Sequence, residues 1–285
     1  MEYRNLLSPS WDDYELIDSG DNKKLERYGK YFVIRPETQA IWEASKPEKW
    51  LAANARFDWK EGKGNWKNNG VPESWDLSWG DMKFSCKLTS FKHTGIFPEQ
   101  SPNWEWLKEK TKKLESPEVL NLFGYTGLAS IATAKAGARV THVDASKQSN
   151  AWAKNNAELS DVPENTIRYM LDDALRFCER EVRREKVYNG IILDPPAFGR
   201  GPKGEVWKIE EDLPKLLASI KKLLSPKAGS FLLLNGYAAG YSPQSFLRVV
   251  ENLFPKAKGQ YGELCIEETS TGKLLPSGIY ARIVI

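Results

Sequence analysis

An acidic residue followed by two prolines is the pattern in this sequence with the clearest chemical use. The run reads Ile191-Ile192-Leu193-Asp194-Pro195-Pro196-Ala197-Phe198. An apolar strand would end at Asp194, and the prolines restrict the backbone that follows it. Asp194 and the Pro195 carbonyl can accept hydrogen bonds from an amine or a ring N–H, and Phe198 can stack on a planar group. The run therefore predicts catalytic roles for Asp194, Pro195 and Phe198, and a strand that merely ends in a proline turn is the alternative.

A second pattern runs from an apolar strand through a glycine turn toward a helix. It reads Val119-Leu120-Asn121-Leu122-Phe123-Gly124-Tyr125-Thr126-Gly127. In open α/β sheets ligands bind outside the carboxyl ends of the strands, so we expect this turn to face a cofactor. Gly124 and Gly127 remove side chains where a ligand would approach the backbone closely. A tight turn that binds nothing is the alternative, because a lone Gly-x-x-Gly is a weak signal.

Acidic residues follow the next two predicted strands. Asp144 ends the run Thr141-His142-Val143-Asp144, about twenty residues after the turn, where an acid can accept hydrogen bonds from ribose hydroxyls. Asp172 and Asp173 are placed to meet the edge of an adenine ring. Each acid alone could simply cap a helix, since aspartate is a favoured N-cap. Three such loops together predict a cofactor that contains a nucleoside.

The turn also indicates which cofactor this is. A dinucleotide-binding turn has the form Gly-x-Gly-x-x-Gly, whose middle glycine admits a pyrophosphate. Here the bulky residues Tyr125 and Thr126 stand between Gly124 and Gly127. The turn therefore favours a cofactor without phosphates, and S-adenosylmethionine is such a ligand. A nicotinamide-dependent oxidoreductase is the alternative.

The elements that position these residues alternate between strand and helix from about residue 118, which is typical of a parallel sheet. The expected strands are 119–123, 139–143, 166–170, 188–194 and 230–235, and the expected helices are 126–136, 146–159, 173–184, 210–224 and 243–253. Two further strands, 262–268 and 279–285, are expected to pair antiparallel. The predicted fold class is α/β, a Rossmann-like seven-stranded domain whose ending matches the methyltransferase version of that fold better than the dehydrogenase version.

The region before this domain has a different composition. Of the chain's 11 tryptophans, only Trp152 and Trp207 follow residue 110, and short alternating runs such as Tyr31-Phe32-Val33-Ile34 are broken by glycine, asparagine and proline. This is typical of a small β-rich domain. We expect a β-rich domain over residues 1–100, with a possible part in substrate recognition, and the cofactor-binding domain over residues 101–285. Tryptophans can stack on nucleobases, but packing of a small core is the favoured interpretation.

The composition of the chain limits which classes of protein it can belong to. The chain has 285 residues, a net charge of +3 and a pI near 8.5, which permits a nucleic-acid partner without requiring one. Its 3 cysteines form no Cys-x-x-Cys pair and only 2 histidines are present, so we expect neither a zinc site nor a disulfide framework. We expect no signal peptide and no membrane span, and hence a cytoplasmic protein.

Several runs together resemble a known family. The stretch from His93 to Leu253, with the closing Pro276-Ser277-Gly278-Ile279-Tyr280, resembles the catalytic domain of class I RNA methyltransferases that modify cytosine C5 in large-subunit ribosomal RNA. The matching runs are His93-Thr94-Gly95-Ile96-Phe97-Pro98-Glu99-Gln100, Asn121-Leu122-Phe123-Gly124-Tyr125-Thr126-Gly127, Val143-Asp144-Ala145-Ser146, Asp172-Asp173 and Asp194-Pro195-Pro196-Ala197-Phe198. They span roughly two-thirds of the chain, and the motifs are specific in combination.

The resemblance implies a class I methyltransferase domain, an S-adenosylmethionine site and an RNA partner, with ribosomal RNA preferred. The residues it implies for that site are Gln100, Phe123, Tyr125, Asp144, Ser146, Asp173 and Asp194. We extend the predicted cofactor site to the neighbouring residues Asn121, Gly124, Thr126, Gly127, Ala145 and Asp172. No metal and no membrane partner are expected.

The chain lacks a chemical group that this family uses in catalysis. Methylation of cytosine C5 uses a thiolate that adds to C6, which the family supplies after the fifth strand. Here that segment reads Leu232-Leu233-Leu234-Asn235-Gly236-Tyr237-Ala238-Ala239 and contains no cysteine. We therefore expect methyl transfer to a heteroatom, or to a carbon that needs no thiol. A methyltransferase for a protein or a small molecule, and a non-catalytic RNA-binding module, are the alternatives.

Three basic segments could contact RNA. The cluster before the first strand is a better candidate for phosphate contacts than the predicted helix 173–184, and its residues are Lys108, Lys110, Lys112 and Lys113. The segment Gly199-Arg200-Gly201-Pro202-Lys203-Gly204 could be a mobile substrate loop, or a solvated connection. The predicted helix 173–184 and the residues after it mix cations with acids, so a solvated face is the favoured interpretation there. The cations are Arg176, Arg180, Arg183, Arg184 and Lys186, and the acids are Glu179, Glu181 and Glu185.

Overall fold

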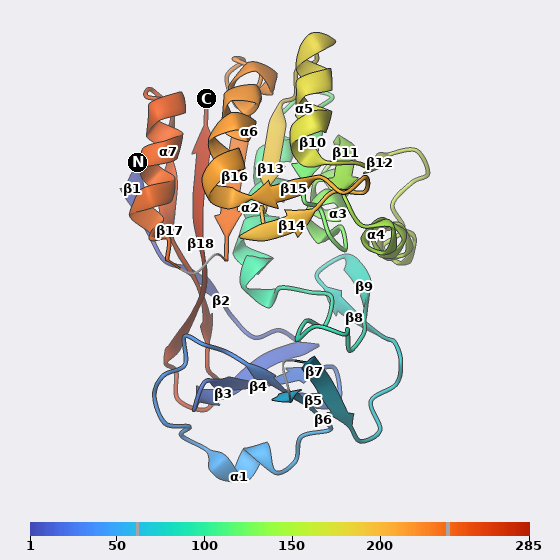
Figure 1. The fold of residues 1–285 in the computed structure, drawn as a ribbon, viewed down its shortest axis with the longest axis vertical. Helices are drawn as coiled ribbons and strands as arrows, with labels where there is room; N and C mark the ends of the chain where they lie inside the picture. The colour runs from blue at the N-terminus through green and yellow to red at the C-terminus, as the bar shows by residue number, and fades with distance from the viewer. Residues whose placement is uncertain (61–62, 238–239) are drawn as a thin grey trace. The chain divides into compact units, whose positions relative to one another are not determined.

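The computed structural model describes residues 1–60, 63–237 and 240–285, and the chain forms two compact units (Figure 1). The larger unit comprises Met1–Leu6, Pro102–Glu263 and Gly278–Ile285, and the smaller unit comprises Leu7–Ser101 and Leu264–Ser277. The predicted boundary after residue 100 therefore differs from these units in two short segments. The first six residues belong to the larger unit, and residues 264–277 belong to the smaller one. The predicted segment 232–239 is described only as far as residue 237.

The main sheet is built from parallel strands that follow one another with helices between them. They are β10 (Glu118–Leu122), β11 (Arg139–Asp144), β12 (Ile167–Leu171), β13 (Gly190–Leu193) and β16 (Phe231–Gly236). β18 (Leu274–Val284) pairs antiparallel with β16, and β17 (Lys258–Glu267) lies beside β18. The strand order β17-β18-β16-β13-β10-β11-β12 confirms the predicted seven-stranded sheet. β1 (Glu2–Tyr3) and β2 (Leu6–Ser8) also pair with β17.

Helices cover both faces of this sheet. α5 (Ala174–Arg183), α6 (Ile209–Leu223) and α7 (Pro243–Leu253) lie side by side on the face toward the viewer in Figure 1. α3 (Leu128–Lys135) and α4 (Lys147–Leu159) pack behind it, as does α2 (Ser101–Lys112), whose Trp106 meets the ring of Phe231 at 5.5 Å. Leu120, Ile191, Leu216 and Leu232 are fully buried in the core between strands and helices. Nearly continuous apolar strands are what a sheet buried on both faces requires.

Several elements of the larger unit were not predicted, namely α2, β1 and a hairpin. β14 (Phe198–Arg200) and β15 (Val206–Lys208) form an antiparallel hairpin between β13 and α6. The segment 199–204, expected as a loop, therefore begins in a strand and turns back through 201–205. Each strand has only 3 residues, which is too short for a periodic pattern to be recognised.

The smaller unit is β-rich, as expected. Its 5-stranded sheet has the order β3 (Tyr14–Gly20), β4 (Lys23–Tyr28), β5 (Tyr31–Pro36), β6 (Ala55–Lys60) and β7 (Lys63–Asn68). β8 (Trp75–Trp79) and β9 (Met82–Cys86) form a separate hairpin, and α1 (Pro47–Trp50) and the 3-10 helix η1 (Pro98–Gln100) complete the unit. Trp75 is buried, in line with a packing role, whereas Trp59 is 60% exposed.

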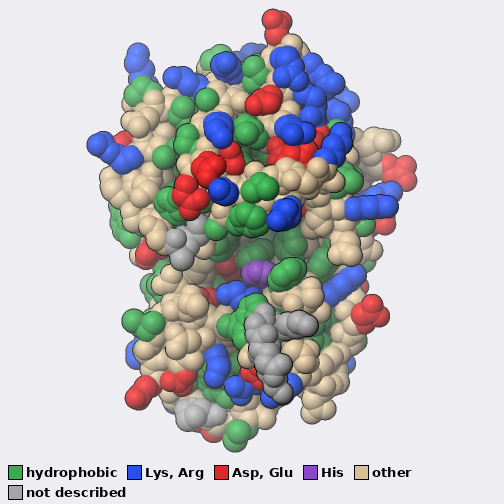
Figure 2. Space-filling view, viewed as in Figure 1, with side chains coloured by type: hydrophobic (Ala, Val, Ile, Leu, Met, Phe, Trp, Pro, Cys, Tyr) green, Lys and Arg blue, Asp and Glu red, His purple; other side chains and the backbone are tan. Residues whose placement is uncertain are grey.

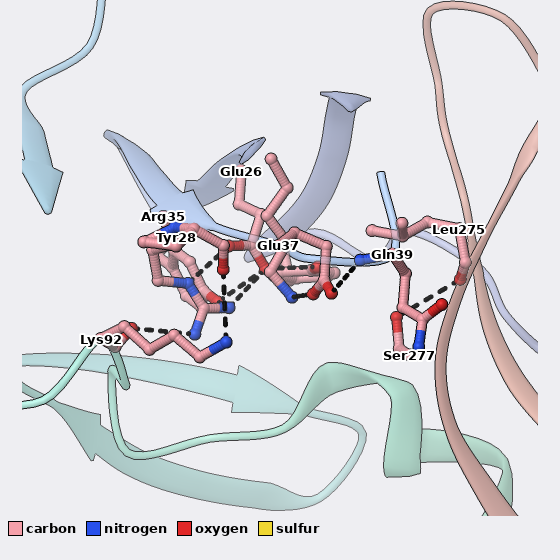
Figure 3. A network of polar contacts seen from close by, with 11 residues as sticks. Glu26, Tyr28, Arg35, Glu37, Gln39, Lys92, Leu275 and Ser277 are labelled. Carbon is pink, nitrogen blue, oxygen red and sulfur yellow. Dashed lines mark hydrogen bonds and ion pairs between the residues drawn. The ribbon is translucent and has the colours of Figure 1, made fainter. Parts of the chain in front are cut away.

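A buried ion pair holds the central strands of this unit together (Figure 3). Arg35 donates from Nε to Glu26 Oε2 at 2.6 Å and from Nη2 to Glu26 Oε1 at 2.7 Å. The hydroxyls of Tyr14 and Tyr28 also donate to Glu26 Oε1, each at 2.9 Å. Burial raises the pKa of Glu26, but the charges of Arg35 and Lys24 outweigh it and bring that pKa to about 2. The carboxylate therefore stays ionised inside the unit because its partners compensate for lost water.

Replacing Arg35 by leucine should cost about 3–5 kcal/mol of unfolding free energy, because it leaves the Glu26 charge buried without its partner. Arg56→Leu is the matched control in the same sheet. It breaks the exposed Arg56–Asp58 pair, whose N···O distance is 2.7 Å, and should cost at most about 1 kcal/mol. Urea denaturation of both variants measures the difference, and equal losses would contradict a structural role for the buried pair.

Candidate functional site

The carboxyl ends of four neighbouring strands lie at one edge of the main sheet. The register aligns Leu122 with Val143 on one side and with Leu193 on the other, and Asp144 with Leu171. The turn after β10, the acid that ends β11, the two acids after β12 and Asp194 after β13 therefore emerge at one edge. The structure brings the acidic loops and the glycine turn together, as parallel topology requires.

The turn after β10 has an unusual backbone. Phe123 has φ +57° and Tyr125 has φ +46°, both in the left-handed region that non-glycine residues seldom adopt. Hydrogen bonds hold this conformation: the Gly124 N–H donates to the Val143 carbonyl at 3.1 Å, and the Gly127 N–H to the Gly124 carbonyl at 3.0 Å. The buried Asn156 amide donates to the Thr126 carbonyl at 2.9 Å. The surrounding structure thus fixes the direction of each peptide group in the turn.

The carboxylate of Asp144 connects this turn to the start of α4. Its Oδ2 accepts the Tyr125 N–H and its Oδ1 accepts the Ser146 N–H, each at 2.8 Å. Burial raises the pKa of Asp144, and these two backbone hydrogen bonds offset part of that rise. A carboxylate has about four lone-pair positions, so about two are left for the hydroxyls of a ligand. Ser146 itself is the N-cap of α4, where its side chain accepts the Ser149 N–H.

Packing explains both glycines of the turn. A Cβ on Gly124 would lie 2.3 Å from Cε1 of His142, and a Cβ on Gly127 would lie 2.8 Å from the Cβ of Ala153. Gly127 also has φ +86°. The sequence alone suggested that a ligand requires these glycines, whereas in the structure neighbouring side chains already require them. Whether a ligand also approaches the turn stays a prediction.

His142 belongs to a buried network beneath the turn that sequence reasoning missed. Ser130 Oγ lies 3.0 Å from His142 Nδ1 and accepts a hydrogen bond from the Asn121 amide at 2.9 Å. Burial lowers the pKa of His142 to about 4, so the ring is neutral at pH 7. The Ser130 hydroxyl, which accepts from Asn121, either donates to Nδ1 or accepts from it, according to the tautomer of the ring. The network supports the turn from below.

Asn121 therefore lies deeper than the sequence suggested. Its side chain is 2% exposed and faces Ser130, so it acts on the turn through the buried network. Ala145 and Ser146 lie at the surface edge of the same site, half-buried and exposed respectively. Gln100 belongs to η1 of the smaller unit and is 6% exposed. Contacts of these residues with a cofactor stay predictions.

The two acids after β12 have different partners. Asp173 is the N-cap of α5, where its side chain accepts the Arg176 N–H at 2.9 Å. Asp172 accepts the Asp173 N–H at 2.9 Å and forms an ion pair with Arg180. Helix capping, the simpler of the two interpretations, therefore applies to Asp173. It leaves lone pairs on that carboxylate for a further donor.

The catalytic candidates end β13 and enter the hairpin. Asp194 is half-buried and Pro195 is buried, whereas Phe198 is 56% exposed at the start of β14. The carbonyl of Pro196 accepts the indole N–H of Trp207 at 2.8 Å. Trp207 also packs against Phe123 with ring centroids 4.9 Å apart. An acid and an exposed aromatic ring thus stand at the same strand end, which suits them to orient a planar acceptor.

Other chemistries lack support among the described residues. All three cysteines, Cys86, Cys178 and Cys265, are buried, and burial raises the pKa of the Cys86 and Cys178 thiols. In the described part of the chain, no cluster of histidine, cysteine, aspartate or glutamate is arranged to hold a metal ion. No helix within residues 1–60, 63–237 and 240–285 is long and apolar enough to cross a membrane.

Comparison with known proteins identifies the class that this fold and site define. The family model described as S-adenosylmethionine-dependent methyltransferase matches residues 29–252. The chain belongs to this family of S-adenosylmethionine-dependent methyltransferases, and S-adenosylmethionine is its cofactor. A crystal structure of an S-adenosylmethionine-dependent methyltransferase from Agrobacterium tumefaciens is 40% identical with a TM-score of 0.92, covering 99% of this chain and 94% of that one.

More distant relatives extend the comparison. Ribosomal RNA large subunit methyltransferase K/L from Pseudoalteromonas translucida is 32% identical over 155 residues, which is 54% of this chain. The counterpart from Shewanella baltica is 36% identical over 146 residues, or 50% of this chain. The chain spans only about a fifth of the length of these curated relatives. A methyltransferase structure from Streptococcus mutans, 18% identical with a TM-score of 0.74 over 96% of this chain and 75% of that one, shares the fold.

Gly124→Ala should destabilise the protein by about 1–3 kcal/mol, because the new methyl group forces the buried His142 ring to shift. Gly199→Ala is a matched control, since the nearest atom to its new Cβ would be 3.5 Å away, an ordinary contact. That control should change stability by no more than about 0.5 kcal/mol. Urea denaturation tests both variants, and an unchanged midpoint for Gly124→Ala would refute the packing explanation.

Asp144→Asn should weaken binding of S-adenosylmethionine by about 1.5–3 kcal/mol, because the amide loses the charge and an acceptor for the ribose hydroxyls. Asp18→Asn is the control in the smaller unit, where the Asp18 oxygens likewise accept two backbone N–H groups, from Ser45 and Lys46. It should alter stability but leave affinity unchanged. Calorimetric titration decides the matter, and equal affinity of Asp144→Asn and the wild type would remove Asp144 from the site.

Proposed function

We propose that this methyltransferase transfers the methyl group to a base of RNA, and that its substrate is ribosomal RNA in the cytoplasm. The observation that carries the proposal is the similarity over 155 residues to ribosomal RNA large subunit methyltransferase K/L. The exposed ring of Phe198, on the segment that follows Asp194, supports it, because a flipped or unpaired base needs a surface to stack on and an acceptor for its N–H groups.

The residues at the sheet edge fit the cofactor. Asp144 retains lone pairs for two ribose hydroxyls, and its raised pKa reflects a partly desolvated carboxyl that such donors would stabilise in the charged form. Asp173 offers an acceptor for the adenine amine at the start of α5. In 123–127 the bulky residues Tyr125 and Thr126 stand where a dinucleotide-binding turn has its middle glycine, which suits a ligand without phosphates.

The chemistry needs little beyond positioning. When bound, S-adenosylmethionine supplies a sulfonium methyl group; the lone pair of the acceptor atom forms a new bond to that carbon as the carbon–sulfur bond breaks, its electron pair staying on sulfur. Asp194 orients the acceptor through its N–H and takes up the proton that the acceptor loses. Phe198 holds the plane of the base so that the acceptor lone pair points along the line of transfer.

The burial of the cysteines speaks against one class of target atom, a pyrimidine carbon that needs a thiolate. Addition of a thiolate to a pyrimidine ring requires an accessible sulfur, whereas every cysteine of the chain is buried. A ring or exocyclic nitrogen of a base needs no such nucleophile, because its own lone pair attacks the methyl carbon. We therefore assign a nitrogen, rather than cytosine C5, as the acceptor.

We propose phosphate contacts from exposed basic side chains around α5, in place of the solvated face that the sequence favoured there. Figure 2 shows Lys and Arg side chains gathered over the end of the larger unit where Figure 1 places this helix. Arg176 and Arg184 remain 60% exposed although each has an acidic partner, and Arg183 and Lys186 are exposed as well. Such contacts position RNA without reading its sequence, and they weaken with salt.

The experiment is transfer of labelled methyl from S-adenosylmethionine to RNA from a host strain that lacks this gene, with protein and metabolite fractions in parallel. Label in RNA, found on a base nitrogen after nucleoside digestion, is the expected result. Label confined to the protein or metabolite fraction would replace RNA by the alternative substrate class. RNA that binds without being labelled would favour the non-catalytic module.

Asp194→Asn should lower the rate of RNA methylation by about 10²-fold or more, because the amide cannot take up the proton that the methylated nitrogen releases. Affinity for the cofactor should be nearly unchanged. Asp161→Asn is the matched control. Asp161 follows α4 in an exposed turn with φ +54°, which asparagine also adopts, and it lies at the opposite end of the sheet. The Asp161→Asn variant should methylate RNA at the rate of the wild type. Full activity of Asp194→Asn would remove Asp194 from the catalytic residues.

A further inference from the structure

The two prolines after Asp194 create a structural problem. Pro195 and Pro196 have no N–H, so this segment cannot donate backbone hydrogen bonds to hold itself in place. Its carbonyl groups are the backbone atoms through which the protein can fix it. The Pro196 carbonyl belongs to the peptide unit that joins Pro196 to Ala197, one residue before Phe198. A donor to that carbonyl therefore holds the backbone between Asp194 and Phe198.

Trp207 supplies such a donor from within the core. Its indole Nε1–H donates to the Pro196 carbonyl at 2.8 Å, and the side chain is only 4% exposed. The backbone reinforces this contact, since the Ile209 N–H donates to the Ala197 carbonyl at 3.1 Å. In β15 the residues on either side, Val206 and Lys208, face solvent. Trp207 is thus the buried residue of β15, and its N–H points toward Pro196.

The same indole contacts the turn that carries the predicted cofactor site. Its ring lies 4.9 Å from that of Phe123, with 59° between the two planes. Phe123 begins the turn with φ +57°, so its backbone and side chain are tightly constrained. A second contact joins the hairpin to α5, where Arg176 and Glu205 form an ion pair at 2.9 Å. The hairpin is therefore attached to two elements that we assign to cofactor binding.

We infer that Trp207 is a positioning residue for methyl transfer, which fixes Pro196, and with it the Asp194–Phe198 segment, against the cofactor-binding turn at Phe123. A buried indole N–H needs an acceptor in any case, and here that acceptor lies in the segment that follows Asp194. The inference rests on the proposed function only for the readout that uses RNA. It concerns the geometry of transfer, because the side chain of Trp207 is buried and acts through the Pro196 carbonyl.

Trp207→Phe separates the two contacts of the indole. Phenylalanine keeps an aromatic ring for Phe123 but removes the donor to Pro196. We expect affinity for S-adenosylhomocysteine, the calorimetric probe, to change less than two-fold, while kcat for RNA falls by about ten- to a hundred-fold. The control is Trp66→Phe in the smaller unit, which also removes an indole donor, to the Thr89 carbonyl at 2.6 Å. Its kcat should be unchanged.

A second readout needs no substrate. Hydrogen–deuterium exchange of the peptides covering 196–209 should slow when S-adenosylhomocysteine binds to the wild type, and this slowing should be lost in Trp207→Phe. If the wild type labels no RNA, the proposed function fails and the exchange result alone decides the role of Trp207. Unchanged kcat, exchange protection equal to that of the wild type, or the same loss in Trp66→Phe would each overturn the inference.

Discussion

The short turn after the first strand of the main sheet is the constraint on which the rest of the candidate site depends. Two of its non-glycine residues, Phe123 and Tyr125, have positive φ, a conformation that a free chain would seldom keep. Asp144 accepts the Tyr125 N–H, and the Val143 carbonyl accepts the Gly124 N–H. Without these bonds the peptide groups would rotate, and the edge of the sheet would lose its fixed shape.

Buried packing below the turn provides the same rigidity from the other side. The ring of His142 occupies the space that a side chain at position 124 would need. Burial keeps that ring neutral, which avoids the cost of a charge in the core. Ser130 is hydrogen-bonded to Nδ1 of the ring and accepts in turn from Asn121. The other ring nitrogen, Nε2 of His142, is buried without a hydrogen-bond partner among the residues that the structure describes.

The catalytic side of the site is rigid for a different reason. Proline limits the backbone after Asp194 but also removes the donors that would anchor it. The hairpin that follows restores the anchorage through Trp207 and Ile209. Methyl transfer is mainly a problem of placing two atoms in line, so a stiff support is more useful here than additional reactive groups.

Much of the architecture could be predicted from the sequence, because strand and helix patterns in an α/β domain are local. The apolar runs before Gly124, Asp144 and Asp194 are such patterns, and parallel topology then places all three residues at one edge. The departure from a thiol mechanism was also visible, since the segment 232–239 contains no cysteine. The 3-residue strands around Phe198 and Trp207 could not be recognised, because their pairing depends on each other and not on periodicity.

The sequence by itself determined the class of fold, the order of the loops and the types of residue that meet at the sheet edge. Only the tertiary structure decided which of those groups are already engaged: Asp172 with Arg180, Asn121 with Ser130, and Gly124 against His142. It also decided that the Pro196 carbonyl faces an indole. The physical reason is that local propensity depends on neighbours along the chain, whereas burial and hydrogen-bond pairing depend on residues that only folding brings together.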